Sequence, residues 1–281
     1  MIRAAASPHA IAHGSSAISA RPGAGNKPVL LTFDELSVRF GGINAVDGVS
    51  FAVAQGEICG LIGPNGAGKT TLFNCVSGLY PIESGDIRFE GRSLKPLPSH
   101  QRASLGIART FQNLALFDSQ SVLFNVLCGV HSRMRKGLFA HVIAHRAVVR
   151  EEKWACEQAE VLLARLGLEP LASRTVGELS LGMRKRVEIA RALAAQPRLL
   201  MLDEPASGLS PLELDELAQF IANLRIQQGL TVLLVEHRLR WVQAVCERVV
   251  ALNFGRIIAD GTPNEVSAHP EVVAAWLGRP H

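Results

Sequence analysis

The stretch GPNGAGKTT, residues 63–71, places three glycines, a lysine and two threonines in one short turn. Its spacing fits Gly-x-x-x-x-Gly-Lys-Thr, the template of a phosphate-binding loop. Glycines let successive backbone N–H groups turn inward around an anion, while the lysine can reach the β and γ phosphates of a nucleotide. The expected phosphate-binding residues are Gly63, Pro64, Asn65, Gly66, Ala67, Gly68, Lys69, Thr70 and Thr71. The stretch predicts a nucleotide site, with an ordinary glycine-rich turn as the alternative.

A pair of carboxylates follows the apolar run in RLLMLDEP, residues 198–205. A buried strand of a parallel sheet delivers such residues to its carboxyl end, where open α/β sheets hold ligands. Asp203 suits a water-mediated contact to Mg²⁺. Glu204 suits orienting or deprotonating an attacking water, a role worth about 10²–10⁴ in rate. The alternative, an exposed pair of loop acids, is disfavoured because the Glu-Pro step ends the strand at a defined point.

Five further positions carry weaker signals. His237 ends another apolar run, TVLLVEH, where a lone histidine is as often a satisfied surface or core residue as a catalytic one. Gln112 in RTFQN carries no signal by itself, and Phe40 in VRFGG is by itself more often core than stacked on a ligand. Ser180 and Gly182 precede a good helix, where they bind an anion or, through the serine, cap the helix. Taken one at a time, these positions leave both interpretations open.

A sheet must bring these residues together. The apolar run EICGLIG predicts a strand buried on both faces directly before the phosphate loop, and a helical pattern follows to Leu79. RLLMLDEP, TVLLVEH and RVVALNFG are further strand signals with helices between them, which predicts an α/β fold with a mostly parallel sheet. VLLTFDELSVRF and VDGVSFAV alternate as antiparallel strands do. Residues from about 113 to 179 are expected to be mostly helical, most clearly from His141 to Leu168.

Composition limits the classes of function. The 281 residues, 48% hydrophobic with a formal net charge of +4, suffice for one domain with a sizeable core or two small ones. So mild a charge is no footprint for nucleic acid. Apolar runs stay short of 18 residues, so any membrane role is expected to be peripheral, and the scattered cysteines predict no metal site. Residues 1–28 contain no acid and no continuous apolar core, which favours a flexible tail over a cleaved presequence.

The order of the motifs is more specific than any one of them. Along the chain come Phe40, the phosphate loop, Gln112, the Leu-Ser-x-Gly signature at 179–182, Asp-Glu-Pro at 203–205, ASGLSP at 206–211 and His237. From about 29 to 281 the chain resembles the nucleotide-binding subunit of an ATP-binding-cassette (ABC) transporter. The resemblance implies one α/β domain with a P-loop NTPase fold. Its RecA-like, mostly parallel sheet would be joined by an antiparallel β-subdomain, an inserted α-helical subdomain at about 113–179 and a helical tail at about 263–281.

In this family two subunits meet head to tail, and each ATP lies between one chain's phosphate loop and the other chain's signature. The resemblance implies that Ser180 and the Gly182 backbone bind the γ-phosphate of the partner's ATP, and that Phe40 stacks on the adenine. The implied contacts to Mg²⁺ are Thr70, Gln112 and, through water, Asp203. The implied catalytic residues are Glu204, His237, Gln112 and Lys69. ATP and Mg²⁺ are the implied cofactors.

Three positions depart from the family pattern. Met183 replaces the glutamine or similar polar residue that usually follows the signature glycine, and its side chain cannot donate the same hydrogen bonds. Arg238 follows the histidine where the family commonly has an acid, and Ser210 stands where Asp or Asn is usual. Since the other motif residues are present, the resemblance implies an active ATPase.

Two stretches resemble one subfamily more closely. Residues 116–168 and the ending VVALNFGRIIADGTPNEVSAHPEVVAAWLG are similar to subunits that serve importers of branched-chain or hydrophobic amino acids, urea, short amides or aromatic acids. The implied partners are a second nucleotide-binding subunit, identical or related, the transmembrane permease subunits and, indirectly, a periplasmic solute-binding protein, with no nucleic acid. Leu116 and Phe117 are the expected permease contacts. The chain would be peripheral, at the cytoplasmic face of the inner membrane.

Three other functions share part of the pattern. A cassette protein of translation or DNA repair usually has two cassettes or long coiled-coil insertions, whereas this chain shows one cassette and no sustained heptads. A non-catalytic ATP clamp would account for Met183 and Ser210 but not for Glu204 and His237. A plain phosphate-loop kinase would leave the signature at 179–182 without a role.

Overall fold

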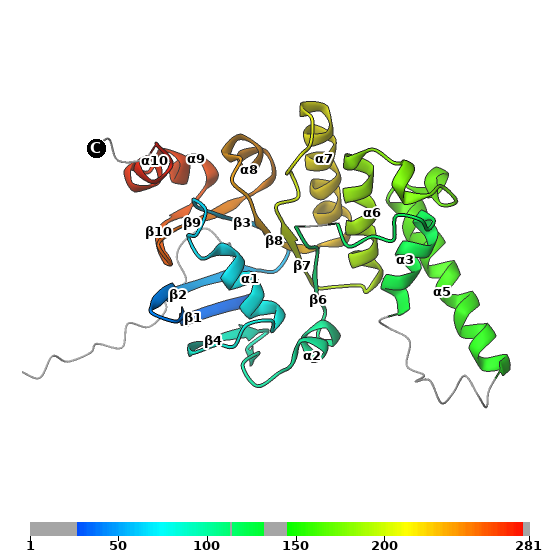
Figure 1. The fold of residues 1–281 in the computed structure, drawn as a ribbon, viewed down its shortest axis with the longest axis horizontal. Helices are drawn as coiled ribbons and strands as arrows, with labels where there is room; N and C mark the ends of the chain where they lie inside the picture. Colours follow the sequence, from blue (N-terminus) through cyan, green and yellow to red (C-terminus); the bar gives the residue numbers. More distant parts are fainter. Residues whose placement is uncertain (1–26, 113, 132–144, 278–281) are drawn as a thin grey trace, which may run out of the picture.

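The computed structural model describes residues 27–112, 114–131 and 145–277, and Figure 1 shows how they are arranged. Within these ranges the strands form a six-stranded sheet and a four-stranded sheet. Segments from distant parts of the chain build the larger sheet, so residues far apart in sequence meet at its edges. The arrangement of the larger sheet therefore decides which motif residues become neighbours.

The larger sheet has the strand order β10-β9-β3-β8-β7-β6, and of its described strands only β10 runs antiparallel to its neighbour. The strands are β3 (Ile58–Ile62), β6 (Ile107–Arg109), β7 (Leu199–Asp203), β8 (Thr231–Val235), β9 (Arg248–Asn253) and β10 (Arg256–Gly261). Every residue of β3, β7 and β8 is buried. Central strands covered on both faces need an unbroken apolar sequence, which these three have. The prediction of a mostly parallel sheet is confirmed.

The smaller sheet is antiparallel, with the strand order β2-β1-β4-β5. Its strands are β1 (Val29–Phe40), β2 (Ile43–Ala54), β4 (Ser84–Phe89) and β5 (Arg92–Ser93). Phe33 of β1 lies opposite Phe51 of β2, and the two rings stack at 4.3 Å. Leu36 and Val38 are buried while Ser37 between them is half-buried, which is the predicted alternation of a sheet with one covered face.

Helices fill the space around both sheets. They are α1 (Lys69–Ser77), α2 (Ser99–Ser104), α3 (Val122–His131), α5 (His145–Arg165), α6 (Leu181–Ala194), α7 (Pro211–Gln228), α8 (Leu239–Val245), α9 (Pro263–Ala268) and α10 (Pro270–Leu277). Two 3₁₀ turns, Glu169–Leu171 and Val176–Glu178, lie between α5 and α6. Figure 1 shows α3 and α5 beyond α6, at the right-hand end of the molecule.

Three buried clusters hold these layers together. The first joins α1, the antiparallel sheet and one face of the larger sheet, and includes Phe33 and Phe73. The second packs the other face of the larger sheet against α6, α7 and α8, and Ile189 of α6 belongs to it. The third joins α3, α5 and α6 through residues such as Leu163 and Ala190. Since α6 contributes to two clusters, it connects the helical part to the sheet.

The predicted fold class is confirmed: a mostly parallel sheet, an antiparallel sheet and a separate group of helices. Three strands were not predicted. β5 and β6 are too short to show a periodicity, and β10 is a half-buried strand at the edge of its sheet. Residues 1–26 of the predicted tail, residues 113 and 132–144 of the predicted helical insertion and residues 278–281 of the predicted helical tail lie outside the described residues. None of the helices in the described ranges is both long and apolar enough to cross a membrane.

Gly129 marks a close approach of α3 to α6, because a Cβ there would overlap the Arg191 carbonyl oxygen and lie 2.9 Å from the Cβ of Ala194. Helix propensity alone would make Gly129→Ala stabilising by about 1 kcal/mol. We expect instead a loss of about 1–3 kcal/mol in the free energy of unfolding, since the helices must separate. Chemical denaturation followed by circular dichroism measures it. Gly42→Ala, where a Cβ meets nothing within 4 Å, is the control. Unchanged or increased stability of Gly129→Ala would contradict the close packing.

Candidate nucleotide-binding and catalytic site

The phosphate loop connects the carboxyl end of β3 to the amino end of α1. Gly63 and Gly68 have φ angles of +154° and +101°, and a Cβ at either would overlap a backbone carbonyl oxygen, that of Leu252 or of Ala45. Only glycine fits both places. Of the side chains that the structure describes, none caps α1, and no acid lies in its first turn. This helix end therefore presents backbone N–H groups that an anion can bind.

Lys69, the first residue of α1, folds back over the loop. Its Nζ donates to the carbonyl oxygens of Gly63 at 2.7 Å and Pro64 at 2.9 Å. Burial lowers the pKa of the Lys69 ammonium, and the nearby charges of Glu204 and Asp203 act in the opposite direction. Phosphate oxygens bound by the loop would thus lie near the Lys69 ammonium, which the loop carbonyl oxygens already hold.

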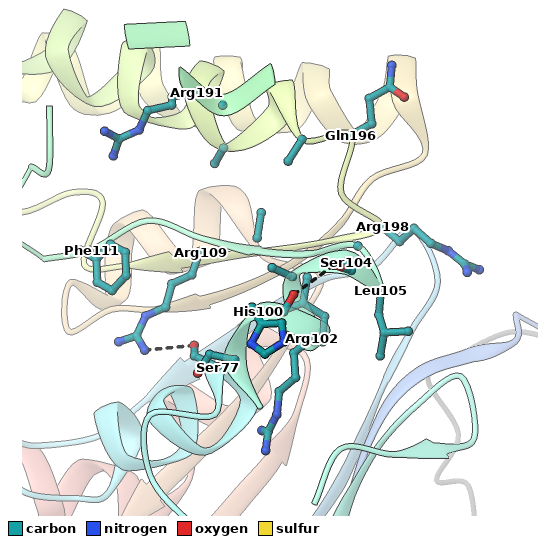
Figure 2. Close-up of a pocket in the computed structure, with 18 of the residues that line it drawn as sticks. Ser77, His100, Arg102, Ser104, Leu105, Arg109, Phe111, Arg191, Gln196 and Arg198 are labelled. Atoms are coloured by element: carbon teal, nitrogen blue, oxygen red, sulfur yellow. Dashed lines mark hydrogen bonds between the residues drawn. The ribbon is translucent and has the colours of Figure 1, made fainter. Parts of the chain in front are cut away.

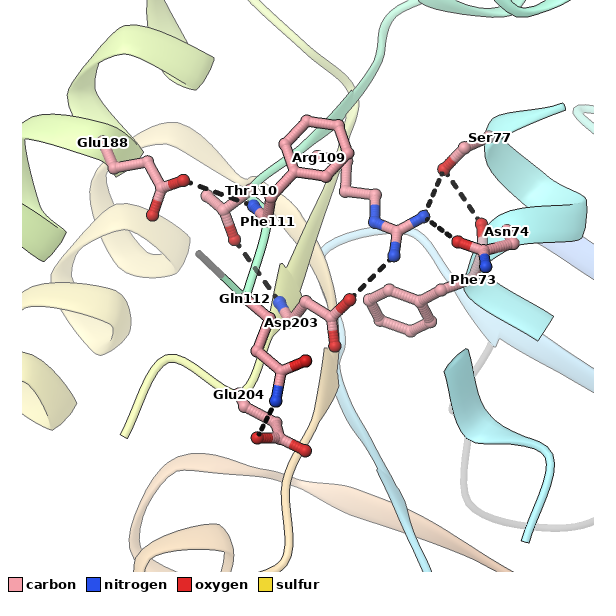
Figure 3. Close-up of polar contacts among 10 residues, drawn as sticks. All are labelled: Phe73, Asn74, Ser77, Arg109, Thr110, Phe111, Gln112, Glu188, Asp203 and Glu204. Carbon is pink, nitrogen blue, oxygen red and sulfur yellow. Dashed lines mark hydrogen bonds and ion pairs between the residues drawn. The ribbon is translucent and has the colours of Figure 1, made fainter. Parts of the chain in front are cut away.

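Asp203 and Glu204 lie where β7 ends, at the carboxyl edge of the larger sheet (Figure 3). Glu204 has a φ of +47°, a left-handed conformation that few residues other than glycine adopt. Its N–H donates to the Val235 carbonyl oxygen at 3.0 Å, and its carbonyl oxygen accepts from Lys185 Nζ at 3.2 Å. These bonds hold the strained backbone in place. Gln112 Nε2 donates to Glu204 Oε2 at 3.0 Å, so the fold brings together two residues that the sequence could not connect.

Oxygen atoms near this edge suit Mg²⁺. Asp203 Oδ2 accepts from Arg109 Nη2 at 2.7 Å, and among the described residues no group donates to Oδ1. The Gln112 amide nitrogen is engaged with Glu204, which leaves its Oε1 as an acceptor. Thr70 is exposed in the first turn of α1. Hydroxyl, amide and carboxylate oxygens are donors that Mg²⁺ accepts, usually together with water and substrate phosphates. The residues present therefore fit this cation.

His237 lies two residues after the end of β8, beside the end of β7, and its side chain is 47% exposed. The preceding residue, Glu236, was not predicted as part of the site and is fully buried. Glu236 Oε1 accepts from the Ala206 N–H at 2.7 Å, and Oε2 accepts from the His237 N–H at 3.1 Å. Burial raises the pKa of the Glu236 carboxyl, against the hydrogen bonds that lower it. An acid at the end of a wholly apolar strand was the available signal. Glu236 ties the backbone of His237 to Ala206, in the loop that follows Glu204.

The signature lies at the start of α6. Ser180 is the N-cap of this helix, and its Oγ accepts from the Met183 N–H at 3.3 Å. The Gly182 N–H donates to Glu213 Oε1 at 3.0 Å. Glu213 forms a capping box with Ser210 at the start of α7, and hydrogen bonds from Ser210 and then from Gly182 lower its pKa to about 2. The ionised Glu213 carboxylate of the same chain thus accepts from the Gly182 N–H, the group that the family pattern assigns to a phosphate.

Two predicted parts of the pocket remain apart from the phosphate loop. Within the described part of the chain, neither Ser180 nor Gly182 forms a hydrogen bond with that loop. Phe40 is 44% exposed and meets Tyr80 edge to face, with ring centroids 5.0 Å apart. Tyr80 was not predicted, since a lone tyrosine after a helix carries no pattern. One chain thus brings the phosphate loop close to the acids, and within the described residues no hydrogen bond links the signature to that loop.

One side of α6 reaches the catalytic loops. Lys185 donates to the Glu204 carbonyl oxygen, and Glu188 Oε1 accepts from the Phe111 N–H at 3.2 Å, one residue before Gln112. Both side chains are buried, and burial lowers the pKa of Lys185 and raises that of Glu188. Neither residue was predicted, because each is only a charged position within the pattern of the helix. They link the helix that carries the signature to the two loops of its own chain.

A cleft of about 1230 Å³ lies beside this region, with α2 and β6 on one side and α3 and α6 on the other (Figure 2). Its cationic lining residues are Arg102, Arg109, Arg191 and Arg198. Figure 2 shows Arg109 and Phe111 on one wall and Arg191 on the wall opposite. No residue of the phosphate loop lines it. The cleft is thus a second concave surface, which shares Arg109 with the acids at the sheet edge.

Comparisons with known proteins agree with this geometry. A family model described as ABC transporter matches residues 46–207, and one described as branched-chain amino acid ATP-binding cassette transporter matches residues 256–281. The chain is 41% identical to the high-affinity branched-chain amino acid transport ATP-binding protein BraF of Pseudomonas aeruginosa and 43% identical to LivG of Salmonella typhimurium, which bears the same description. Each alignment covers 89% of this chain and 98% of the relative.

More distant relatives share the same extent. The lipopolysaccharide export system ATP-binding protein LptB of Escherichia coli is 38% identical over 88% of this chain and 97% of its own length. A crystal structure of a nucleotide-free ATP-binding cassette from an ABC transporter superimposes with a TM-score of 0.78 at 31% identity, covering 89% of this chain and 100% of that one. The motifs, their meeting at one sheet edge and these matches together show that the chain belongs to the ABC transporter family, as an ATP-binding subunit.

Proposed function

We propose that this chain is the ATP-hydrolysing subunit of an importer for branched-chain amino acids or a related solute such as urea, a short amide or an aromatic acid. The identity of 41–43% to two branched-chain amino acid subunits and the match of residues 256–281 support this cargo class. The 38% identity to a lipopolysaccharide export protein leaves export less well supported. The observation that carries the hydrolytic role is the Glu204 carboxylate, which Gln112 holds at the sheet edge near Lys69.

The proposed reaction uses the phosphate loop and the acids together. Backbone N–H groups of the loop and Lys69 bind the phosphates of ATP, and Phe40 stacks on the adenine. Thr70, Gln112 and, through water, Asp203 would hold Mg²⁺, which when bound would offset the charge that develops on the phosphates.

The acid–base step falls to Glu204. Gln112 fixes one oxygen of the Glu204 carboxylate, and the other orients the attacking water and takes its proton. His237 is the further catalytic group at the same edge, held through its backbone by Glu236. The strained backbone of Glu204 supports this role, because left-handed conformations of such residues cluster at functional sites.

A second cassette, identical or related, completes the pocket. Its Ser180 and Gly182 N–H bind the γ-phosphate of the ATP on the first chain, at the positive end of α6. In the single chain Glu213 holds this N–H, so the phosphate must take the place of a carboxylate when two chains close. Closure around two Mg·ATP and reopening after phosphate release would drive transport.

An exposed aromatic pair, Phe117 and Phe124, supports contact with the permease subunits. The rings meet edge to face at 5.8 Å and are 53% and 42% exposed. Asn125 fastens the segment, since its Oδ1 accepts from the Phe117 N–H at 2.8 Å and its Nδ2 donates to the Phe117 carbonyl oxygen at 3.1 Å. Large apolar groups exposed on a held segment are typical of interaction sites. We assign this surface, with Leu116, to permeases that hold the chain at the cytoplasmic face of the inner membrane and connect it to a periplasmic solute-binding protein.

Replacing Glu204 with glutamine tests the catalytic role. We expect Glu204→Gln to lower phosphate release at least about 100-fold, because the side chain keeps its size but no longer accepts a proton. Binding of a fluorescent ATP analogue should persist, since the phosphate loop is unchanged. The matched control is Glu216→Gln, which removes a carboxylate that pairs with Arg186 on the surface of α7. Equal, near-zero rates in wild type and Glu204→Gln would favour a non-catalytic clamp.

Cysteines at Asn65 and Ser180 test the two-chain pocket. Asn65 is exposed in the phosphate loop and is a better site than Gly66, whose φ of +79° disfavours a side chain. In the Glu204→Gln background with ATP, we expect a disulfide between two chains, seen as a dimer on a non-reducing gel. Each cysteine alone is the control for the native thiols. If the doubly substituted protein forms no such bond, with or without ATP, the shared pocket is wrong.

A charge at Phe117 tests the permease contact. In complexes reconstituted with the membrane subunits, Phe117→Glu should lose most solute uptake, because a carboxylate is poorly accommodated in an apolar interface. The ATPase rate of the isolated chain should stay close to wild type. The control is Ile226→Glu on α7, another exposed apolar position at 73% exposure. Uptake that survives in Phe117→Glu would rule out this contact.

A further inference from the structure

Arg109, at the end of β6, contacts two other elements of the site. Its Nη2 donates to Asp203 Oδ2 at 2.7 Å, and its Nη1 donates to Asn74 Oδ1 at 2.7 Å and to Ser77 Oγ at 3.2 Å. Figure 3 shows the guanidinium between Asp203 on one side and the two α1 side chains on the other. The side chains of Arg109 and Asp203 are only 8% and 7% exposed. A buried cation therefore bridges the end of β7 to the helix that begins with the phosphate loop.

Two aromatic rings restrict the guanidinium further. The Phe73 and Phe111 centroids lie 5.4 Å and 5.3 Å from the Arg109 Cζ. A planar guanidinium held by aromatic rings and by fixed acceptors loses little further freedom when it forms a hydrogen bond. The N–H group that contacts Asp203 is thus fixed in direction as well as in distance.

The Asp203 carboxylate has one oxygen bound and one available. Oδ2 is held by Arg109, and within the described residues nothing donates to Oδ1. The Asp203 N–H donates to Thr110 Oγ1 at 3.4 Å, so the backbone is held from the same segment as Arg109. A carboxylate tied through one oxygen cannot rotate freely, which fixes the direction of the other.

We propose that Arg109 is a positioning residue for Mg²⁺. By clamping Oδ2 of Asp203 to α1, it directs Oδ1 toward the hydration water of a cation held by Thr70 on the same helix. The inference rests on the proposed function, since it takes Asp203 as the water-mediated Mg²⁺ contact. In the sequence, Arg109 is only the first residue of the RTFQN stretch, and the family resemblance assigns it no role.

The charge and the geometry of Arg109 act on Mg²⁺ in opposite directions. A guanidinium near the metal repels it, so charge alone predicts that removing Arg109 tightens Mg²⁺ binding. Loss of the clamp predicts weaker binding, because the cation must then order a carboxylate that is free to rotate. The sign of the change therefore separates positioning from electrostatics.

The experiment uses the full chain in the Glu204→Gln background, which is expected to bind ATP without turning it over. Mg²⁺ is titrated, and the dissociation rate of a fluorescent ATP analogue is the readout. In Arg109→Gln we expect the Mg²⁺ concentration at half-saturation to rise about 10-fold, as when a partner of a metal ligand is lost. The affinity for the analogue without Mg²⁺ should change little. An unchanged or lower half-saturation would overturn the proposal.

Three further variants separate positioning from misfolding and from loss of charge. Arg109→Lys keeps the charge but cannot bridge Asp203 and α1 at once, so we expect an intermediate shift. Asn74→Ala removes one anchor without touching Asp203 and should give a smaller shift in the same direction, which tests the proposal even if Arg109→Gln does not fold. Arg198→Gln is the control, because Arg198 lines the same cleft but pairs with Glu90. A failure of the proposed function would differ: the parent Glu204→Gln protein itself would show no Mg²⁺ dependence.

Discussion

The register of three buried parallel strands determines where the chemistry of this protein takes place. Leu61 of β3 lies opposite Val235 of β8, which lies opposite Asp203 of β7. The phosphate loop, His237 and the Asp203–Glu204 pair therefore leave the sheet in one row. Because side chains alternate between faces, a slip of one residue in β7 would turn Asp203 away from the loop. Aliphatic side chains that never touch a nucleotide thus set the geometry of the site.

Around this row, buried charges fix what the sheet alone cannot. Besides Asp203 itself, the buried ionisable groups around the site are Lys69, Lys185, Glu188 and Glu236. The Arg109 side chain is 8% exposed. Each is tolerated because it is paired or hydrogen-bonded, and each contacts a segment outside the strands. Removing one partner of a buried pair typically costs about 3–5 kcal/mol, because the other charge is left buried and uncompensated. That cost is not the net stability of the pair, so these contacts specify loop positions more than they add stability.

The parts of the site that could be predicted from the sequence have local signals. The phosphate loop and the Asp203–Glu204 pair are contiguous and follow apolar runs, so residue type and position on the strand appear together. Arg109, Glu236 and Glu213 were missed because their partners lie 94, 30 and 31 positions away. Periodicity does not reveal which side chains a fold will bring into contact. The main strands of the sheets were predicted because their apolar runs are local signals, whereas the three-residue strand β6 is too short to show one.

The departure at Ser210 has a physical explanation only in three dimensions. The residue caps α7 and forms a box with Glu213, and that carboxylate also accepts from the Gly182 N–H. A serine here thus keeps the local capping that an aspartate or asparagine would supply. The family pattern alone marks the position as unusual, and the contacts show what the side chain does in this chain.

In the proposed pair of chains, helix α6 contributes to two nucleotide pockets. Its first turn carries the amide that would bind the neighbour's phosphate, while Lys185 and Glu188 further along hold the Glu204 carbonyl and the Phe111 amide of the same chain. In the proposed pair, a tilt of the N-terminal end of α6 caused by the neighbour would also move Lys185 and Glu188, which contact the loops that carry Glu204 and Gln112. Because such coupling is reciprocal, the two nucleotide sites of the proposed closed pair would not bind ATP independently. Cooperativity between the two sites would then need no additional coupling element, since α6 already connects the signature to the loops of its own chain.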